Sequence, residues 1–215
     1  DEHKYTLYGG SAGPGKSYWL RWYPIYKLIK WYKRLGLKGI RAGLFCEDYP
    51  ALRDRHISKI EFEFPSWLGE LKAGVSEFHL RPDFGSSVLA LRNLDDPSKY
   101  LSSEFALIAI DELTKNDKKV FDVMRTRLRW TGIDDCKLIG ATNPGEKGQA
   151  SVKNIWIDKI FDPNKIEQDK FAYVKALPSD NPYLSEGYKV ALQSLPEKLR
   201  KAYWEGNWDV FEGQY

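Results

Sequence analysis

The chain has few of the features that mark secreted, metal-stabilised or membrane-spanning proteins. Only two of its 215 residues are cysteines, and Cys46 and Cys136 lie far apart without metal-type spacing. We therefore expect two reduced thiols rather than a disulfide framework or a zinc site. No apolar run approaches the ~18 residues of a membrane span, and no signal peptide is visible. We expect no membrane partner.

The chain also lacks a strong charge bias. Its 33 Lys and Arg residues against 30 Asp and Glu give a formal net charge of +3, which excludes a dedicated polybasic arm but permits a local basic face. Internal repeats and low-complexity tracts are absent. The length fits one large domain, or a domain with an appendage. Because the chain starts at Asp1 and its first strand opens almost at once, we expect a piece of a longer protein.

Short apolar segments alternate with helical ones, which predicts an open, mostly parallel α/β sheet. The expected strands are residues 5–8, 40–46, 77–80, 87–91, 105–110, 136–141 and 171–177; the expected helices are residues 18–35, a stretch from Ala51, residues 118–128 and two C-terminal helices. The last helix is expected to open with a capping box at Ser194 and Glu197, with Pro196 in its first turn, and to close at Gly206. Residues 145–153, rich in Gly and Lys, are expected to be mobile.

Residues 10–17 form the most informative segment, Gly-Ser-Ala-Gly-Pro-Gly-Lys-Ser, which fits G-x-x-x-x-G-K-[ST] at every fixed position. Glycines let backbone N–H groups wrap a phosphate chain, and the following helix points its positive end at the anion. Lys16 would reach the β- and γ-phosphates, and the Ser17 hydroxyl would ligate Mg²⁺. The sequence therefore predicts a nucleoside triphosphate site lined by Gly10, Ser11, Ala12, Gly13, Pro14, Gly15, Lys16 and Ser17.

Two carboxylates follow a buried strand, in Ala-Leu-Ile-Ala-Ile-Asp-Glu at residues 106–112. Asp111 is expected at the carboxyl end of the strand, where ligands bind in open α/β sheets, and there it can hold Mg²⁺ together with Ser17. Glu112 is well placed to polarise a water against the γ-phosphate. A phosphate loop alone does not separate a kinase, a GTPase and a motor ATPase, but this second carboxylate favours a hydrolase. The alternative is that both acids start a surface loop.

Thr142 and Asn143 end the next buried strand, in Leu-Ile-Gly-Ala-Thr-Asn-Pro at residues 138–144. A hydroxyl and an amide at this edge can hydrogen-bond the attacking water or sense loss of the γ-phosphate. Taken alone, Thr-Asn-Pro is also an ordinary turn. The order of the three segments favours the functional interpretation.

Taken together, these residues resemble the ATPase domain of the large terminase subunit, the DNA-packaging motor of tailed bacteriophages. The likeness covers nearly the whole chain and rests on the order of several short motifs: residues 9–17, Glu47-Asp-Tyr-Pro-Ala-Leu-Arg53, Tyr100-Leu-Ser-Ser-Glu-Phe105 leading into Ile110-Asp-Glu112, Arg127-Leu-Arg129, Thr142-Asn-Pro144, Asp180-Asn-Pro-Tyr-Leu184, Leu195-Pro and Gly206-Asn-Trp208.

The resemblance implies a P-loop NTPase of the additional-strand, catalytic-glutamate type. ATP and Mg²⁺ would be its cofactors, Glu112 the catalytic glutamate, and Thr142 and Asn143 the motif that couples hydrolysis to DNA movement. Residues 1–177 would form the ATPase core. Residues 178–215 would form a small helical lid subdomain and the start of a linker to an absent nuclease domain, so we expect no nuclease activity.

The resemblance also implies partners and a location. The partners would be double-stranded DNA, further copies of the chain in a ring, the viral portal and procapsid, and the small terminase subunit. The location would be the cytoplasm of an infected bacterium. Candidate DNA contacts are Lys27, Lys30, Lys33, Arg34, Lys147 and Lys153, although a charged helix face is usually just solvated.

The sequence departs from the family at the arginine that stabilises phosphate charge. Many members carry it inside the phosphate loop, where this chain has Ser11, Ala12 and Pro14. Arg127 and Arg129 are the first candidates for a replacement, in the same or a neighbouring subunit, followed by Arg125, Arg53 and Arg55.

Three other functions remain open at this point. A helicase-like motor would show DNA-stimulated hydrolysis with no dependence on a capsid. A small-molecule or nucleotide kinase would need an acceptor, and a nucleotide-gated binding module would bind ATP without turning it over.

Overall fold

The computed structural model describes residues 3–160, 168–211 and 213. The chain divides into two compact units: the first unit contains residues 1–16, 112–119 and 140–215, and the second unit contains residues 17–111 and 120–139. Within the described residues, no helix is both long and apolar enough for a membrane span.

The second unit contains five strands, in the order β3 (Gly69–Lys72), β4 (Glu77–Leu80), β5 (Val88–Asn93), β2 (Arg41–Cys46) and β6 (Leu107–Ile110). Strand β2 pairs in parallel with β5 and β6, whereas β3, β4 and β5 pair antiparallel. All four residues of β6 are buried, as expected for a continuous apolar strand covered on both faces.

Helices of the second unit include α1 (Lys16–Leu35), which follows the phosphate loop, and α4 (Lys118–Arg125). After β2 the chain turns helical at α2 (Tyr49–Leu52), where the Asp48 carboxylate accepts a hydrogen bond from the Ala51 amide at 2.8 Å. A π-helical turn, Arg53–Ile57, joins α2 to α3 (Ser58–Glu63). Such turns often occur at functional sites, because the extra residue changes which side chains face inward.

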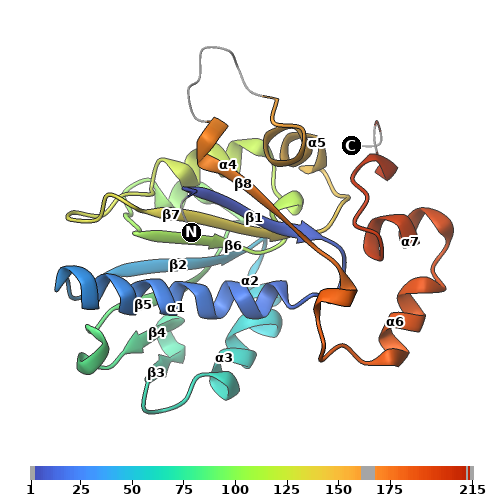
Figure 1. Cartoon of the computed structure of the whole chain (residues 1–215). Helices are drawn as coiled ribbons and strands as arrows, with labels where there is room; N and C mark the ends of the chain where they lie inside the picture. The colour runs from blue at the N-terminus through green and yellow to red at the C-terminus, as the bar shows by residue number, and fades with distance from the viewer. Residues whose placement is uncertain (1–2, 161–167, 212, 214–215) are drawn as a thin grey trace. The chain divides into compact units, whose positions relative to one another are not determined.

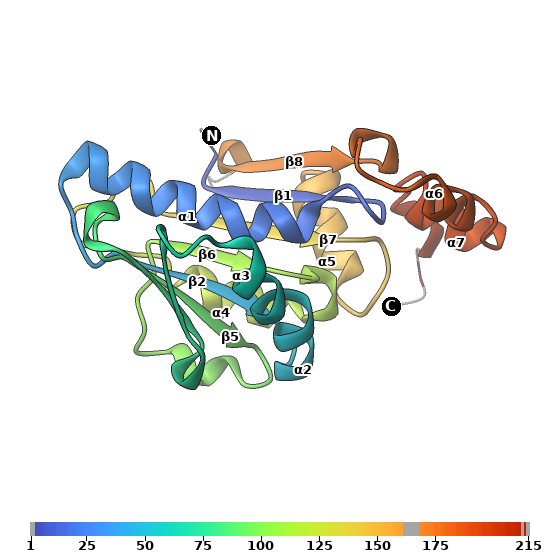
Figure 2. The same ribbon diagram turned by 90° about the horizontal axis from the view of Figure 1, so that it is seen from below.

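In the first unit β1 (Tyr5–Gly10) pairs in parallel with β8 (Phe171–Ala176). Helix α5 (Gln149–Val152) follows β7 (Lys137–Thr142), and α6 (Glu186–Gln193) and α7 (Glu197–Tyr203) lie beyond the carboxyl ends of β1 and β8 (Figure 1). Figure 2 shows the same succession from below. Within the first unit the strand order is β7-β1-β8.

The predicted fold class, a mostly parallel α/β sheet flanked by helices, is confirmed. The expected strands and the five expected helical regions are all present, with ends shifted by a few residues. The boundary between an ATPase core and a lid at residue 177 stays a prediction.

Two short elements were not predicted, and one local prediction is wrong. Strand β3 was not expected, because Gly69–Lys72 is a four-residue edge strand with little apolar pattern. Helix α5, within the Gly- and Lys-rich residues 145–153, was not expected either. The capping box is absent: Ser194 ends α6, and α7 begins after Pro196 without a side-chain cap.

Candidate functional site

The phosphate loop leaves the carboxyl end of β1 and runs directly into α1. Gly10, Gly13 and Gly15 have φ angles of +124°, +88° and +91°, a region that favours glycine because a Cβ atom would be strained there. Since α1 begins at Lys16, the positive end of its dipole faces the loop. The backbone therefore has the form that the motif predicts for binding an anion.

Lys16 connects this loop to the end of β7. Its side chain is buried, and its Nζ donates to Asn143 Oδ1 at 2.8 Å and to the Ser11 carbonyl oxygen. The loop lysine and the Thr-Asn-Pro segment, 127 residues apart in sequence, thus lie in direct contact.

Thr142 is fully buried, and its side chain contacts Thr114. Its Oγ1 lies 2.5 Å from Thr114 Oγ1 and accepts a hydrogen bond from the Thr114 amide at 3.2 Å. Thr142 therefore ties the end of β7 to the segment that follows Glu112. The sequence did not single out Thr114, because a threonine in a short loop carries no distinctive signal.

Glu112 opens the 3₁₀ turn Leu113–Lys115 in a left-handed conformation, with φ +46°. This conformation is uncommon for a residue with a side chain and costs of order 1 kcal/mol or more. Hydrogen bonds from the Lys115 amide and the Asn116 side chain to the Glu112 carbonyl oxygen hold it. A strained backbone kept at Glu112 fits a functional role for its side chain.

Asp111 belongs to the second unit and lies among charged neighbours. Its carboxylate is 3% exposed, and its Oδ2 lies 3.0 Å from both Arg55 and His56 Nε2. Arg55 also pairs with Glu47 at the end of β2. Burial would lower the pKa of Arg55, but the hydrogen bond to Glu47 and the charge of Asp111 raise it.

Ser17 and Asp111 fit a magnesium site by their chemistry. A hydroxyl and an anionic carboxylate are the oxygen donors that Mg²⁺ prefers, and Ser17 lies in the first turn of α1. Cys46 and His56 also lie close to Asp111, with possible ligand atoms within 4.8 Å of one another. Burial, then the charge of Asp111, raises the pKa of the Cys46 thiol, which disfavours the thiolate form that binds a metal ion.

The candidate arginines of the second unit have identifiable partners. Arg129 is 58% exposed and donates to Glu104 at 2.8 Å. Arg127 donates to the Leu101 carbonyl oxygen and to Thr126 Oγ1, and Arg53 pairs with Asp54 on the surface. Arg55 is held at Asp111, a contact that the sequence did not predict. His56 was missed altogether.

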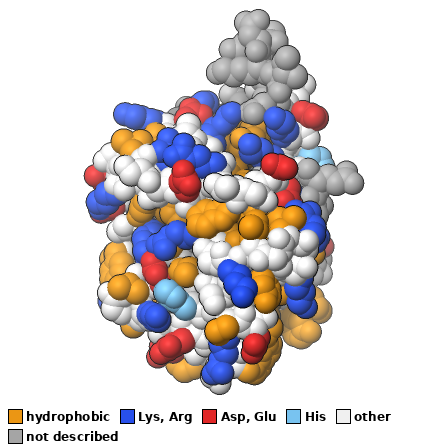
Figure 3. Space-filling view, turned by 90° about the vertical axis from the view of Figure 1, so that its left-hand side faces the viewer, with side chains coloured by type: hydrophobic (Ala, Val, Ile, Leu, Met, Phe, Trp, Pro, Cys, Tyr) orange, Lys and Arg blue, Asp and Glu red, His pale blue; other side chains and the backbone are white. Residues whose placement is uncertain are grey.

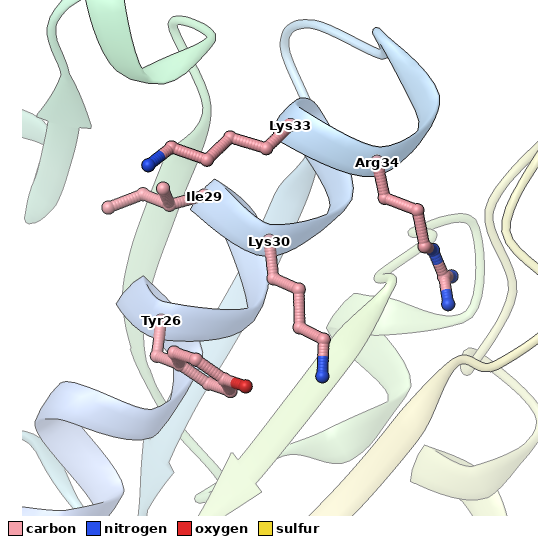
Figure 4. Close-up of a pocket in the computed structure, with 5 residues that line it drawn as sticks. All are labelled: Tyr26, Ile29, Lys30, Lys33 and Arg34. Carbon is pink, nitrogen blue, oxygen red and sulfur yellow. The ribbon is translucent and has the colours of Figure 1, made fainter.

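The candidate DNA-binding lysines differ in exposure. Tyr26, Ile29, Lys30, Lys33 and Arg34 line a pocket of about 480 Å³ along one side of α1 (Figure 4). Lys27, by contrast, is 1% exposed and pairs with Asp135 at 3.1 Å, which puts it out of reach of a phosphate backbone. On the face shown in Figure 3, Lys and Arg are interspersed with acidic and apolar side chains rather than gathered in one basic area.

Comparison with known proteins gives the family. A sequence profile described as phage terminase large subunit matches residues 69–206, more than half of the chain. None of the curated proteins matches the sequence.

Solved structures show the same fold at low sequence identity. The large terminase of a thermophilic bacteriophage aligns with a TM-score of 0.75 and 16% identity over 96% of this chain and 48% of its own. The chain therefore spans about half the length of that relative. The ATPase domain of the large terminase of Thermus phage P74-26 aligns with a TM-score of 0.66 and 14% identity, over 97% of this chain and 90% of its own. The fold, the phosphate loop and the profile match agree: this chain belongs to the phage terminase large subunit family.

Proposed function

We propose that this chain is an ATP-hydrolysing motor domain that drives viral double-stranded DNA into a procapsid. The observation that carries the proposal is the contact between Lys16 and Asn143, at 2.8 Å. It connects the residue expected to hold the γ-phosphate with the segment expected to couple hydrolysis to movement. Support also comes from a large terminase of the same fold that was solved in complex with ATP-gamma-S.

In this proposal the phosphate loop binds ATP through its backbone amides and the N-terminus of α1. Ser17 and Asp111 would hold Mg²⁺, which when bound would neutralise charge on the β- and γ-phosphates. Arg55 and His56 keep the Asp111 carboxylate oriented. Glu112 orients a water for in-line attack and accepts its proton.

Asn143 gives the site a way to sense the nucleotide. Lys16 donates to Asn143 and to the Ser11 carbonyl oxygen, and a γ-phosphate would compete for the same ammonium group. Binding and release of phosphate would therefore break and restore the bond to Asn143.

The motor would act as a ring of identical subunits with the portal, the procapsid and the small terminase subunit, in the cytoplasm of an infected bacterium. The charge-stabilising arginine would come from a neighbouring subunit. Arg129 and Arg127 are the candidates, and the exposure of Arg129 supports the idea. Lys30 and Lys33 would contribute to a weak, salt-sensitive grip on DNA.

A packaging assay with procapsids tests the function. We expect ATP-dependent protection of DNA from nuclease, and we expect Asn143→Ala to keep most ATP hydrolysis while losing DNA protection. DNA-stimulated hydrolysis with no capsid dependence would instead indicate a helicase-like motor. If phosphate is transferred only when an acceptor is added, the protein is a kinase. If ATP binds without turnover, the protein is a nucleotide-gated binding module.

A further inference from the structure

The C-terminal segment of the first unit holds the N-terminal half of the phosphate loop. Each of residues 10–13 contacts this segment. Gly10 lies so close to Gly206 that a Cβ on Gly206 would be 2.9 Å from the Gly10 carbonyl carbon, and Ser11 Oγ donates to the Ala176 carbonyl oxygen at 2.5 Å. The Ala12 amide donates to the Tyr203 carbonyl oxygen at 2.8 Å, and the Gly13 carbonyl oxygen accepts from Asn181 Nδ2 at 2.7 Å. These partners include residues of two motifs, Asp180-Asn-Pro-Tyr-Leu184 and Gly206-Asn-Trp208, to which the proposed function gives no role.

Of these contacts from the C-terminal segment, the one made by the side chain of Asn181 reaches furthest along the loop, to Gly13. Its Oδ1 accepts a hydrogen bond from the Tyr183 amide at 3.0 Å, so the orientation of its Nδ2 toward the loop is fixed. Leu184 and Tyr188 pack against the same glycine, since a Cβ on Gly13 would lie 3.1 Å and 3.0 Å from their side chains.

The peptide unit between Gly13 and Pro14 explains why this contact matters. Proline has no amide hydrogen, so the Gly13 carbonyl oxygen is the one hydrogen-bonding group of that unit. Gly13 also has the conformational freedom of a glycine, with φ +88°. The bond from Asn181 therefore holds the orientation of this peptide plane, and a separate bond from the Tyr8 hydroxyl to the Pro14 carbonyl oxygen, at 3.4 Å, holds the next one.

We propose that Asn181 is a positioning residue for the phosphate loop: its side-chain amide fixes the Gly13–Pro14 peptide plane and presets the amides that receive the nucleotide phosphates. The inference rests on the proposed ATP binding. It also connects the C-terminal segment, through the Asn181 side chain, to the loop that is proposed to bind the nucleotide.

Asn181→Asp is the sharpest variant, because it keeps the shape and the acceptor for Tyr183 but removes the donor to Gly13. Its matched control is Asn207→Asp. Asn207 Oδ1 accepts a hydrogen bond from the Asp209 amide at 2.8 Å, in a turn of the same kind, so the charge change is equal. Asn181→Ala and Asn207→Ala form a second pair that adds no charge.

We expect both Asn181 variants to bind a fluorescent ATP analogue about threefold to tenfold more weakly, the range given by loss of one hydrogen bond. Both Asn207 variants should bind it like the unchanged protein. Amide hydrogen exchange without nucleotide should speed up at Gly13 and at residues 15–17 in the Asn181 variants and stay unchanged in the strands.

Equal affinity in the Asn181 and Asn207 variants would overturn the inference while leaving the proposed function intact. Faster exchange throughout the protein would overturn it as well, because Asn181 would then act on general stability. If the unchanged protein and Lys16→Ala bind the analogue equally weakly, the proposed function itself fails.

Discussion

The buried carboxylate of Asp111 depends on side chains from the π-helical turn Arg53–Ile57. Arg55 and His56 both contact its Oδ2 at 3.0 Å, and Arg55 continues to Glu47. One cation thus serves two carboxylates, and its loss would leave two poorly solvated negative charges together.

We therefore expect Arg55→Gln to lower the free energy of unfolding by about 3 kcal/mol, as for other buried pairs that lose one partner. Urea denaturation measures this. Arg53→Gln is the matched control, two residues away in the same turn, because Arg53 is 61% exposed and its partner Asp54 is 65% exposed. Equal unfolding midpoints for the two variants would contradict the role given to Arg55.

At this scale the sequence predicted part of the site. The phosphate loop could be predicted because its glycines and Lys16 have a fixed spacing. Four further candidates could be predicted because they lie at the ends of buried strands: Asp111, Glu112, Thr142 and Asn143. The contacts of Arg55, His56 and Asn181 were not predictable. Arg55 and Asp111 are 56 residues apart in the sequence, and Asn181 and Gly13 are 168 residues apart. These contacts depend on the fold of the chain rather than on local spacing.

Helix α1 is tied to the segment before β7 through Asp135. This carboxylate accepts hydrogen bonds from Lys27, Trp31 and Arg34, at 3.1, 2.9 and 2.7 Å. Burial alone would raise the pKa of Asp135, but the bonds from Trp31 and Lys27 and the positive charges lower it to about 2. The pairing also lets Lys27 be buried.

The lowered pKa of Asp135 predicts a pH dependence of stability. The contribution of the ionised Asp135 carboxylate to the free energy of unfolding is fully present above its unfolded-state pKa of about 4 and is lost as the pH falls toward 2. Since Asp135 is 37% exposed, we expect solvent screening to limit it to about 1 kcal/mol. Urea midpoints of the unchanged protein and Asp135→Asn should differ at pH 5 and converge near pH 2; a constant difference would contradict the assignment.

Gly206 allows the segment after α7 to lie directly against the phosphate loop. Its φ is +64°, and a Cβ there would lie 2.9 to 3.1 Å from backbone atoms of Gly10. The sequence predicted Gly206 as the residue that closes the last helix. The close approach to Gly10 was not predictable, because a glycine at a helix end and a closely packed glycine cannot be distinguished in a single sequence.

We expect Gly206→Ala to destabilise the protein by about 1–3 kcal/mol more than Gly36→Ala, which carries the backbone strain without the overlap. Gly36 has φ +70°, and a Cβ there would meet no heavy atom of the described residues within 4 Å. Thermal unfolding compares the two variants. Equal losses would show that the approach of Gly206 to Gly10 costs nothing.

At the scale of the whole chain, fold class was the most predictable property, since buried strands alternating with helices admit few arrangements. The division into units was not predictable. The phosphate loop and Glu112 belong to the first unit, while Ser17 and Asp111 belong to the second. Neighbouring residues in one motif thus fall in different compact units, and no composition change marks the boundary.

The central claim is ATP hydrolysis with Glu112 as the catalytic carboxylate, and one paired measurement tests it most directly. Phosphate release and ATP affinity are measured on the same assembled protein, in the presence of DNA, for the unchanged chain, Glu112→Gln and Glu146→Gln. Glu146 is an apt control because it is also a glutamate in a left-handed conformation, with φ +68°.

We predict that Glu112→Gln keeps its ATP affinity and loses about 100-fold or more in phosphate release, while Glu146→Gln behaves like the unchanged protein. Undiminished phosphate release by Glu112→Gln, or none by the unchanged protein, would contradict the account.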